Sequence, residues 1–133
     1  MDLSLSHCHI LVHDPEEALG FYRDALGLTV RTDVSNEGYR WVTLTPPGQP
    51  EVEIVLSQPE PGRPADDGEA LRRLLLKGSL PGVIFRTPDL DATFEKVRAS
   101  GAEVLQEPID QFWGARDCAF RDPSGNLVRI AQA

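Results

Sequence analysis

A strand followed by a capped helix, at the start of the chain, constrains the fold more than any other stretch. Residues 6–13 (SHCHILVH) alternate in character, as a half-buried strand requires. One face carries the apolar side chains Cys8, Ile10 and Val12, and the other carries His7, His9, Leu11 and His13. Asp14 and Pro15 then predict a helix start, and Gly27 predicts its end near Leu26, before a second strand. One strand face is therefore available for chemistry.

The same unit recurs in the second half of the chain. Residues 82–87 (GVIFRT) predict a strand, Asp89 predicts a helix cap, and Gly101 ends that helix before a strand over residues 102–105. When Gly27 is laid on Gly101, two alanine positions also coincide. The pattern indicates an internal repeat.

The rest of the chain completes each repeat with short alternating segments separated by turns rich in proline, glycine and asparagine. The predicted strands are 28–34, 39–45, 51–56, 116–121 and 127–131, with a loop over 106–114 and a tight turn over 122–126. The segment 58–80 is predicted to be a linker with a short helix, capped by Asp66 with Glu69. We therefore expect an α+β chain of two βαβββ modules, residues 1–57 and 81–133, within one domain over 1–133.

Charge and composition exclude several classes of partner. The formal net charge is −8 and the isoelectric point is near 4.8, so no basic face is available for nucleic acid or an anionic membrane surface. No segment approaches the roughly 20 apolar residues of a membrane span, and the first residues carry no basic leader, so we expect a cytoplasmic location. Cys8 and Cys118 have no metal-type spacing and are predicted to be small, free, buried side chains.

The segment 14–28, with Phe21-Tyr22 and Leu26-Gly27-Leu28, and the segment 120–126 (FRDPSGN) carry a family resemblance. The chain resembles the vicinal oxygen chelate superfamily, which includes glyoxalase I, bleomycin-resistance proteins and extradiol dioxygenases. The resemblance covers essentially the whole chain. It implies two βαβββ modules whose curled mixed sheets form a cup, completed or buttressed by a second subunit, so we expect a homodimer.

Metal-dependent members of this superfamily hold a divalent ion such as Zn, Ni, Fe or Mn with four ligands, from the first and last strands of each module. By this resemblance His7 and Glu53 match the first two ligand positions. The third falls on Gly82, or on Pro81, and the fourth on Arg129, none of which is a usual ligand. Two ligands rarely hold a catalytic ion.

Glu53 interrupts an apolar strand, and a carboxylate there needs a partner, which His7 or Arg129 would provide. Two interpretations of Arg129 stay open: a structural charge network with His7 and Glu53, or recognition of an anionic ligand group. His9 shares its strand face with His7 and is a further candidate for ligand binding.

Phe112 and Trp113 lie in a predicted loop before a strand. Such aromatic side chains fit closure over an apolar ligand, and they fit a dimer contact equally well. Arg40 and Trp41 alternate on one strand, so one of them faces the same side as Glu53 and the other faces away.

Two functions follow from these residues and the resemblance. In the first, the protein is a lyase, isomerase or dioxygenase in which a metal on His7, Glu53 and further groups chelates vicinal substrate oxygens. Glu53, or a free neighbouring carboxylate, would then move the proton. In the second, it is a metal-free module that sequesters a small molecule such as an antibiotic. The absent third and fourth ligands favour the second chemically.

Overall fold

The computed structural model describes all 133 residues, which divide into two compact units. Unit 1 is Met1–Arg73 and unit 2 is Leu74–Ala133. The elements in chain order are β1 (His7–Leu11), α1 (Pro15–Leu19), η1 (Gly20–Ala25), β2 (Thr29–Asn36), β3 (Tyr39–Thr45), β4 (Glu53–Ser57), α2 (Ala65–Leu76), β5 (Val83–Thr87), α3 (Leu90–Ala99), β6 (Glu103–Asp110), β7 (Arg116–Arg121) and β8 (Leu127–Gln132). The predicted α+β fold with two βαβββ modules is confirmed.

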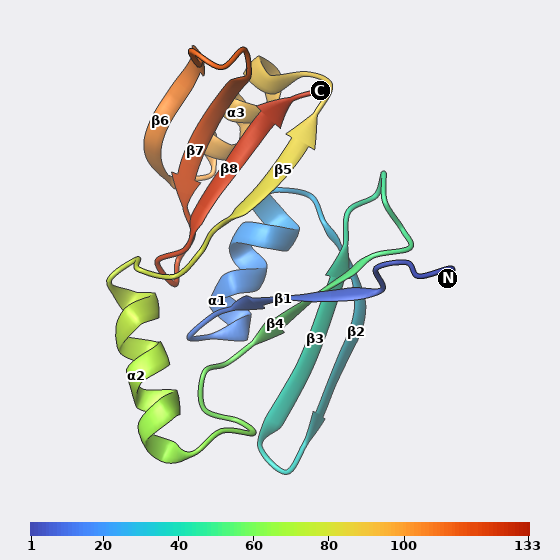
Figure 1. Ribbon diagram of the computed structural model, residues 1–133, viewed down its shortest axis with the longest axis vertical. Helices are drawn as coiled ribbons and strands as arrows, with labels where there is room; N and C mark the ends of the chain where they lie inside the picture. The colour runs from blue at the N-terminus through green and yellow to red at the C-terminus, as the bar shows by residue number, and fades with distance from the viewer. The chain divides into compact units, whose positions relative to one another are not determined.

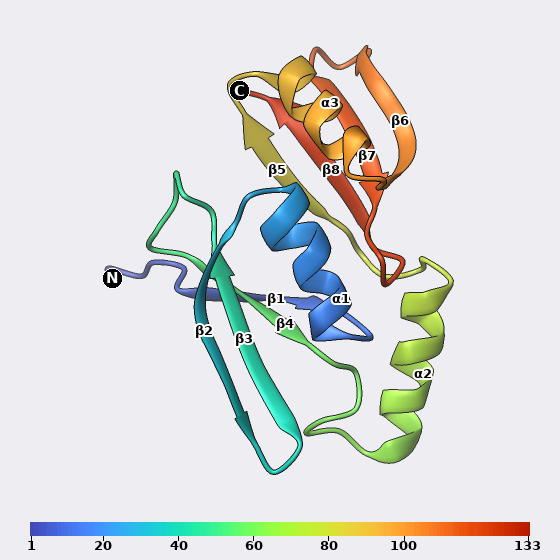
Figure 2. The same cartoon turned by 180° about the vertical axis from the view of Figure 1, so that it is seen from behind.

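Each unit contains one four-stranded mixed sheet. The strand order is β1-β4-β3-β2 in unit 1 and β5-β8-β7-β6 in unit 2 (Figure 1). In both sheets the first and last strands of the module, β1 with β4 and β5 with β8, are therefore neighbours and run parallel. Within unit 1, α1 covers one face of the sheet, and within unit 2, α3 covers one face of its sheet (Figure 2). In each unit one sheet face is therefore buried by a helix.

Local sequence explains how the helices begin and end. The Asp14 side chain accepts a hydrogen bond from the backbone N–H of Glu16 at 3.0 Å, and the Asp89 side chain accepts one from Ala92 at 3.2 Å, so both predicted caps are present. The first helix continues past α1 as a π-helical segment, η1, and then stops at Gly27, where φ is +80°.

The core of each unit lies between its sheet and its helix. In unit 1 the alternating strand residues pack against Leu19 and Tyr22 of the first helix, and in unit 2 they pack against Phe94 and its neighbours. The buried strand side chains on the helix-facing side are Ile10, Val42, Leu44, Ile54 and Leu56 in unit 1, and Cys118, Phe120, Val128 and Ile130 in unit 2, with buried Val12 directly after β1. The less buried Val30 in unit 1 and Val83, Phe85 and Val104 in unit 2 lie opposite these core residues in the strand pairing and share their face.

Two local expectations were wrong. The loop predicted from Gln106 to Gly114 is mostly strand, because β6 continues to Asp110 through two register irregularities opposite β7. The bulges break the simple alternation that sequence reading relies on. Asp66 does not cap α2, because that helix already begins at Ala65 and Asp66 lies in its first turn, where a negative charge is still favourable.

The segment 120–126, which carried part of the family resemblance, is structural. Asp122 Oδ1 accepts hydrogen bonds from the backbone N–H groups of Ser124, Gly125 and Asn126 at 2.9, 2.9 and 2.8 Å, which fixes the turn between β7 and β8. Gly125 has φ +111°, and a Cβ there would lie 2.5 Å from the Leu75 carbonyl oxygen. The turn therefore docks against the end of α2 through a position that only glycine fits.

Both cysteines are free, as predicted. Cys118 is buried in the core of unit 2, where burial and the nearby Asp117 charge raise the pKa of its thiol to about 11. Cys8 is half-buried in β1. Among the helices, none has the length and apolar character needed to cross a membrane.

Candidate functional site

The first polar cluster lies on the unit 1 sheet face away from α1, and its centre is Glu53. Because β1 and β4 pair in parallel with His7 opposite Glu53, the two side chains meet, with His7 Nε2 3.2 Å from Glu53 Oε2. The Thr43 hydroxyl donates to Glu53 Oε1 at 2.7 Å from the neighbouring strand β3. Ser6 Oγ lies 3.0 Å from His7 Nδ1. The partner that Glu53 was expected to need is therefore His7.

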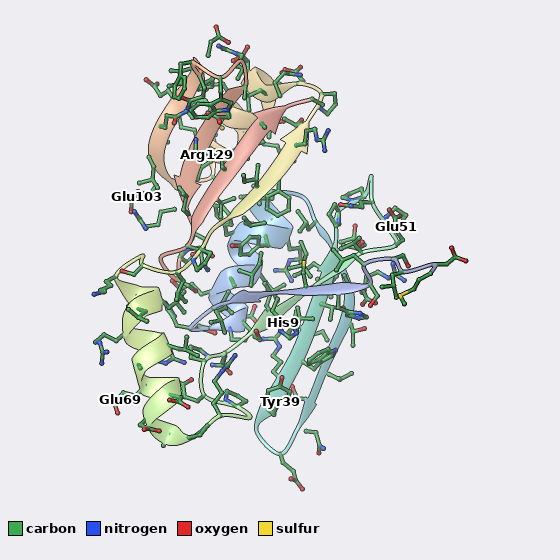
Figure 3. The ribbon with its side chains drawn as sticks, viewed as in Figure 1. His9, Tyr39, Glu51, Glu69, Glu103 and Arg129 are labelled. Carbon is green, nitrogen blue, oxygen red and sulfur yellow. The ribbon has the colours of Figure 1, made fainter.

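His9 continues the same face one alternation further along β1 (Figure 3). Its Nδ1 lies 3.1 Å from the Ser57 hydroxyl oxygen, and its ring meets the edge of Trp41 at a centroid distance of 6.5 Å. Trp41 is thus the member of the Arg40-Trp41 pair that shares the face with Glu53. Arg40 points away and pairs with Asp33 and Glu16, at 2.7 and 2.8 Å. The result is a face of two imidazoles, an indole and a carboxylate.

The His7–Glu53 pair fits a catalytic metal poorly. An imidazole and a carboxylate are suitable donors, but no group of three histidine, cysteine, aspartate or glutamate side chains lies together in the structure. The expected third position, Gly82, offers no donor, and a Cβ there would lie 2.3 Å from the Leu127 carbonyl oxygen. A ligating side chain would not fit at Gly82 without a backbone shift. His7 and Glu53 alone therefore do not form the ligand set of a catalytic metal ion.

The second polar cluster lies on the unit 2 sheet face away from α3, and its centre is Asp117. Arg129 Nη1 lies 3.3 Å from Asp117 Oδ1 and donates to Gln106 Oε1 at 3.2 Å. Gln106 Nε2 donates to Asp117 Oδ1 at 2.9 Å. Gln111 Nε2 donates to Asp117 Oδ1 at 2.9 Å and to Gln106 Oε1 at 3.2 Å. We call these four residues the Asp117 network.

The charge of Asp117 is stabilised inside this network. Burial opposes ionisation, but hydrogen bonds from Gln111 and Gln106 and the positive charge of Arg129 outweigh it, so the pKa of Asp117 lies below its usual value. Only 2% of Asp117 is exposed, and no buried side-chain polar atom in the chain lacks a partner. The network is a set of half-buried side chains around one buried, fully hydrogen-bonded carboxylate.

Arg129 therefore has its ion pair within its own unit. Within unit 2, Arg129 pairs with Asp117 from the adjacent strand β7. Its register partner on β5 is Ile84, an exposed apolar residue. A guanidinium already paired with a buried carboxylate is less available for an anionic ligand group.

Phe112 and Trp113 occupy the tip of the hairpin between β6 and β7. Phe112 is 96% exposed and Trp113 is 59% exposed, and their rings meet edge to face at a centroid distance of 4.9 Å. The turn is closed by a hydrogen bond from the Gln111 N–H to the Ala115 carbonyl. The aromatic tip, Phe112 with Trp113, begins one residue after Gln111.

Sequence reasoning missed Asp117, Gln106, Gln111 and Thr43. The sequence pattern predicts a loop around Gln106 and Gln111. It places Asp117 in a strand but does not indicate which side chains contact it. One signal was available for Asp117: the short turn over 122–126 joins β7 to β8, which places Asp117 on the same face as Arg129. The two glutamines gave no such signal, because the bulges in β6 decide which way they face.

Comparison with known proteins identifies the class. The family model described as the Glyoxalase/Bleomycin resistance protein/Dioxygenase superfamily matches residues 4–130, and the chain belongs to this superfamily. Among its relatives, the uncharacterized Bacillus subtilis protein YurT is 30% identical over 124 residues, which cover 92% of this chain and 94% of YurT.

Two solved structures are close in fold and in sequence. UcmS2 superposes with a TM-score of 0.89 at 34% identity, over 100% of both chains. TnmS3, described as an antibiotic binding protein from Streptomyces sp. CB03234, superposes with a TM-score of 0.77 at 28% identity, over 99% of this chain and 98% of TnmS3. The chain is therefore similar along almost its whole length to a protein described as antibiotic binding.

Proposed function

We propose that this protein is a small-molecule binding module that captures its ligand without a metal ion. The observation that carries the proposal is that His7 and Glu53 contact each other and are hydrogen-bonded to Ser6 and Thr43. No third metal-ligating side chain lies beside them. The similarity to TnmS3 supports the same conclusion. In this proposal Glu53 holds His7 in place and does not bind an ion.

The ligand of this module is a small apolar or aromatic molecule, such as an antibiotic. Trp41 and His9 supply ring surfaces on the unit 1 face, and Phe112 with Trp113 supplies a second aromatic surface in unit 2. Aromatic side chains provide large contact area with little conformational entropy to lose. Ser57, beside His9, adds a hydroxyl group on the first face that can orient a polar edge of the ligand.

Equilibrium binding of an uncharged fluorescent dye tests this proposal. Protein purified without chelator is analysed for Zn, Ni, Fe and Mn, and is then titrated with Nile red with and without EDTA. We expect substoichiometric metal and saturable dye binding that EDTA does not change. Stoichiometric metal, together with loss of binding after chelation, would instead support the enzyme interpretation.

The enzyme interpretation rests on one specific observation, the contact between His7 and Glu53 at the two matching family positions. An imidazole–carboxylate pair can move a proton when a substrate lies within hydrogen-bond reach. Its test is turnover of a glyoxalase-type hemithioacetal after loading with Ni²⁺ or Zn²⁺. A Glu53→Gln variant that keeps Nile red binding but abolishes that turnover would establish catalysis.

We also propose that the functional form is a homodimer. Each sheet ends in edge strands, β1 and β2 in unit 1 and β5 and β6 in unit 2. Exposed apolar side chains on three of these strands include Val34, Ile84 and Ile109. A second copy can cover such edges. Light scattering at micromolar concentration tests this, and a strictly monomeric mass would contradict it.

A further inference from the structure

We propose that Asp117 is a positioning residue for ligand capture: with Gln106, Gln111 and Arg129 it holds the hairpin tip so that Phe112 and Trp113 form a fixed aromatic grip for a flat, uncharged ligand. The inference rests on the proposed function and adds to it a residue set and a ligand class. It also gives the Asp117 network a purpose beyond unit 2 stability.

The physical link between the network and the tip is Gln111. Its side-chain amide donates to Asp117 Oδ1 at 2.9 Å and to Gln106 Oε1 at 3.2 Å, while its backbone closes the turn with Ala115 and Gly114. The side chain therefore ties the turn to the sheet, and the backbone bonds shape the turn. Removal of the side chain alone would keep the backbone turn and the Asp110–Arg116 pairing but would remove the side-chain tie to Asp117 and Gln106.

The hairpin needs such a tie because its own ladder is irregular. The register between β6 and β7 shifts twice, between Val104 and Gln106 and again between Gln106 and Ile109. Bulges remove ladder hydrogen bonds and bend the strand. A hairpin with two shifts, ending in two exposed rings, would otherwise be free to adopt several tip positions. Hydrogen bonds to an ionised, buried carboxylate are stronger than neutral ones and restrict this freedom.

The ligand class follows from the charges around the tip. The two guanidinium groups on the neighbouring strands are both paired, Arg129 with Asp117 at 3.3 Å and Arg116 with Asp91 at 3.0 Å. Arg116 also lies 3.6 Å from Asp110. The tip itself therefore combines apolar ring surface with guanidinium groups that already have carboxylate partners, and Asp110 adds a further negative charge. Such a surface favours stacking with a flat, uncharged aromatic molecule over binding of an anion.

The first measurement detects tip order without any ligand. The chain has two tryptophans, so a Trp41→Phe background leaves Trp113 as the single indole. Fluorescence anisotropy decay of Trp113 is compared among this parent, Gln111→Ala and Asp117→Asn. We expect a larger fast component in both variants. Gln58→Ala, which removes a single hydrogen bond from a part-buried glutamine to the His13 carbonyl in unit 1, is the matched control and should match the parent.

The second measurement detects capture, with Nile red as the probe in the wild-type background. We expect Gln111→Ala and Asp117→Asn to raise the dissociation constant about three- to tenfold, since fixing the tip beforehand lowers the entropy cost of binding. The double variant Phe112→Ala/Trp113→Ala should raise it by about tenfold or more, equivalent to about 1.4 kcal/mol. Thermal unfolding of each variant reports stability separately, and Gln111→Ala serves if Asp117→Asn does not fold.

The outcomes separate the inference from the proposed function. Unchanged Trp113 motion in Gln111→Ala overturns the positioning role, even where the double variant binds weakly. Wild-type affinity in the double variant overturns the aromatic grip, while saturable wild-type binding would leave the proposed function standing. A double variant that changes only the oligomeric mass, without changing dye affinity, would identify the tip as a dimer contact and also overturn the inference.

Discussion

The two units share one topology, but their sheet faces away from the helices carry different kinds of polar cluster. In unit 1, the His7 side chain is 44% exposed and the Glu53 side chain is 25% exposed. Glu53 accepts a hydrogen bond from the Thr43 hydroxyl of β3. In unit 2, the Asp117 side chain is 3% exposed and three side chains bond to it. The first cluster is accessible to a ligand, whereas the carboxylate at the centre of the second is almost closed, although Arg129 beside it is 27% exposed.

This difference indicates that two units with the same fold can have different roles, one in ligand contact and the other in fixing local structure. An accessible imidazole and carboxylate keep hydrogen-bonding capacity for a ligand and contribute little stability, because water competes for them. A closed, satisfied charge cluster has no such spare capacity and instead fixes the local structure around it. The comparison predicts that the polar side chains of unit 1 can change partners, whereas those around Asp117 in unit 2 keep a fixed arrangement.

The largest expected effects test whether the two units are stabilised separately. Tyr22 is fully buried in the core of unit 1, and Phe120 is fully buried in the core of unit 2. The ring centroids of Phe120 and Phe94 are 5.4 Å apart. Replacing either with alanine should cost about 3–5 kcal/mol of unfolding free energy. Hydrogen exchange should rise mainly in unit 1 for Tyr22→Ala and mainly in unit 2 for Phe120→Ala.

Phe112→Ala is the control, because the same kind of ring is 96% exposed there. It should change the unfolding free energy by less than about 0.5 kcal/mol. Equal exchange increases in both units for each core variant would mean that the chain unfolds as one cooperative body, and the comparison would then lose its energetic basis.

An intermediate effect is expected when the central carboxylate of each cluster is removed. Asp117→Ala leaves Arg129 without its ion-pair partner and should cost about 3 kcal/mol. Glu53→Ala should cost about 1 kcal/mol or less, because His7 can turn to water. Urea denaturation of both variants measures the difference. Equal losses would show that the accessible cluster contributes as much stability as the closed one.

The smallest expected effect is a difference in response to acid and salt. Hydrogen bonds from Arg40 hold the pKa of Asp33 in unit 1 below its usual value, and the Asp117 network does the same for Asp117. A carboxylate with a depressed folded-state pKa adds stability above its unfolded-state pKa, and that stability is lost as the pH falls through the folded value. Both contributions should therefore decline in the acid range, below the usual aspartate value near 3.8.

Salt should distinguish the two carboxylates. The Asp33 side chain is 37% exposed, so screening at about 1 M salt should move its pKa back toward the usual value. Asp117 should respond less because it is buried. NMR titration of the side-chain carboxyl carbons at two salt concentrations measures both. A larger salt shift at Asp117 would contradict the assignment of a closed cluster.

The sequence alone determined the features that depend on neighbours along the chain. Asp14 and Asp89 cap their helices, Gly27 takes a positive φ, and β3 and β7 have the predicted bounds. These features follow from side-chain hydrogen bonds to the nearby backbone, from the steric freedom of glycine and from strand alternation. The repeat of these signals was enough to predict both βαβββ modules.

Tertiary structure decided the chemistry on the sheet faces. Glu53 was visible as a carboxylate needing a partner, and only the β1–β4 register selected His7. The β7–β8 register places Arg129 beside Asp117. Gln106, between two register shifts of β6, and Gln111, in the turn after β6, both donate hydrogen bonds to Asp117. A one-residue change of register reverses the face of every side chain in a strand, so partners across strands cannot be assigned from spacing along one strand.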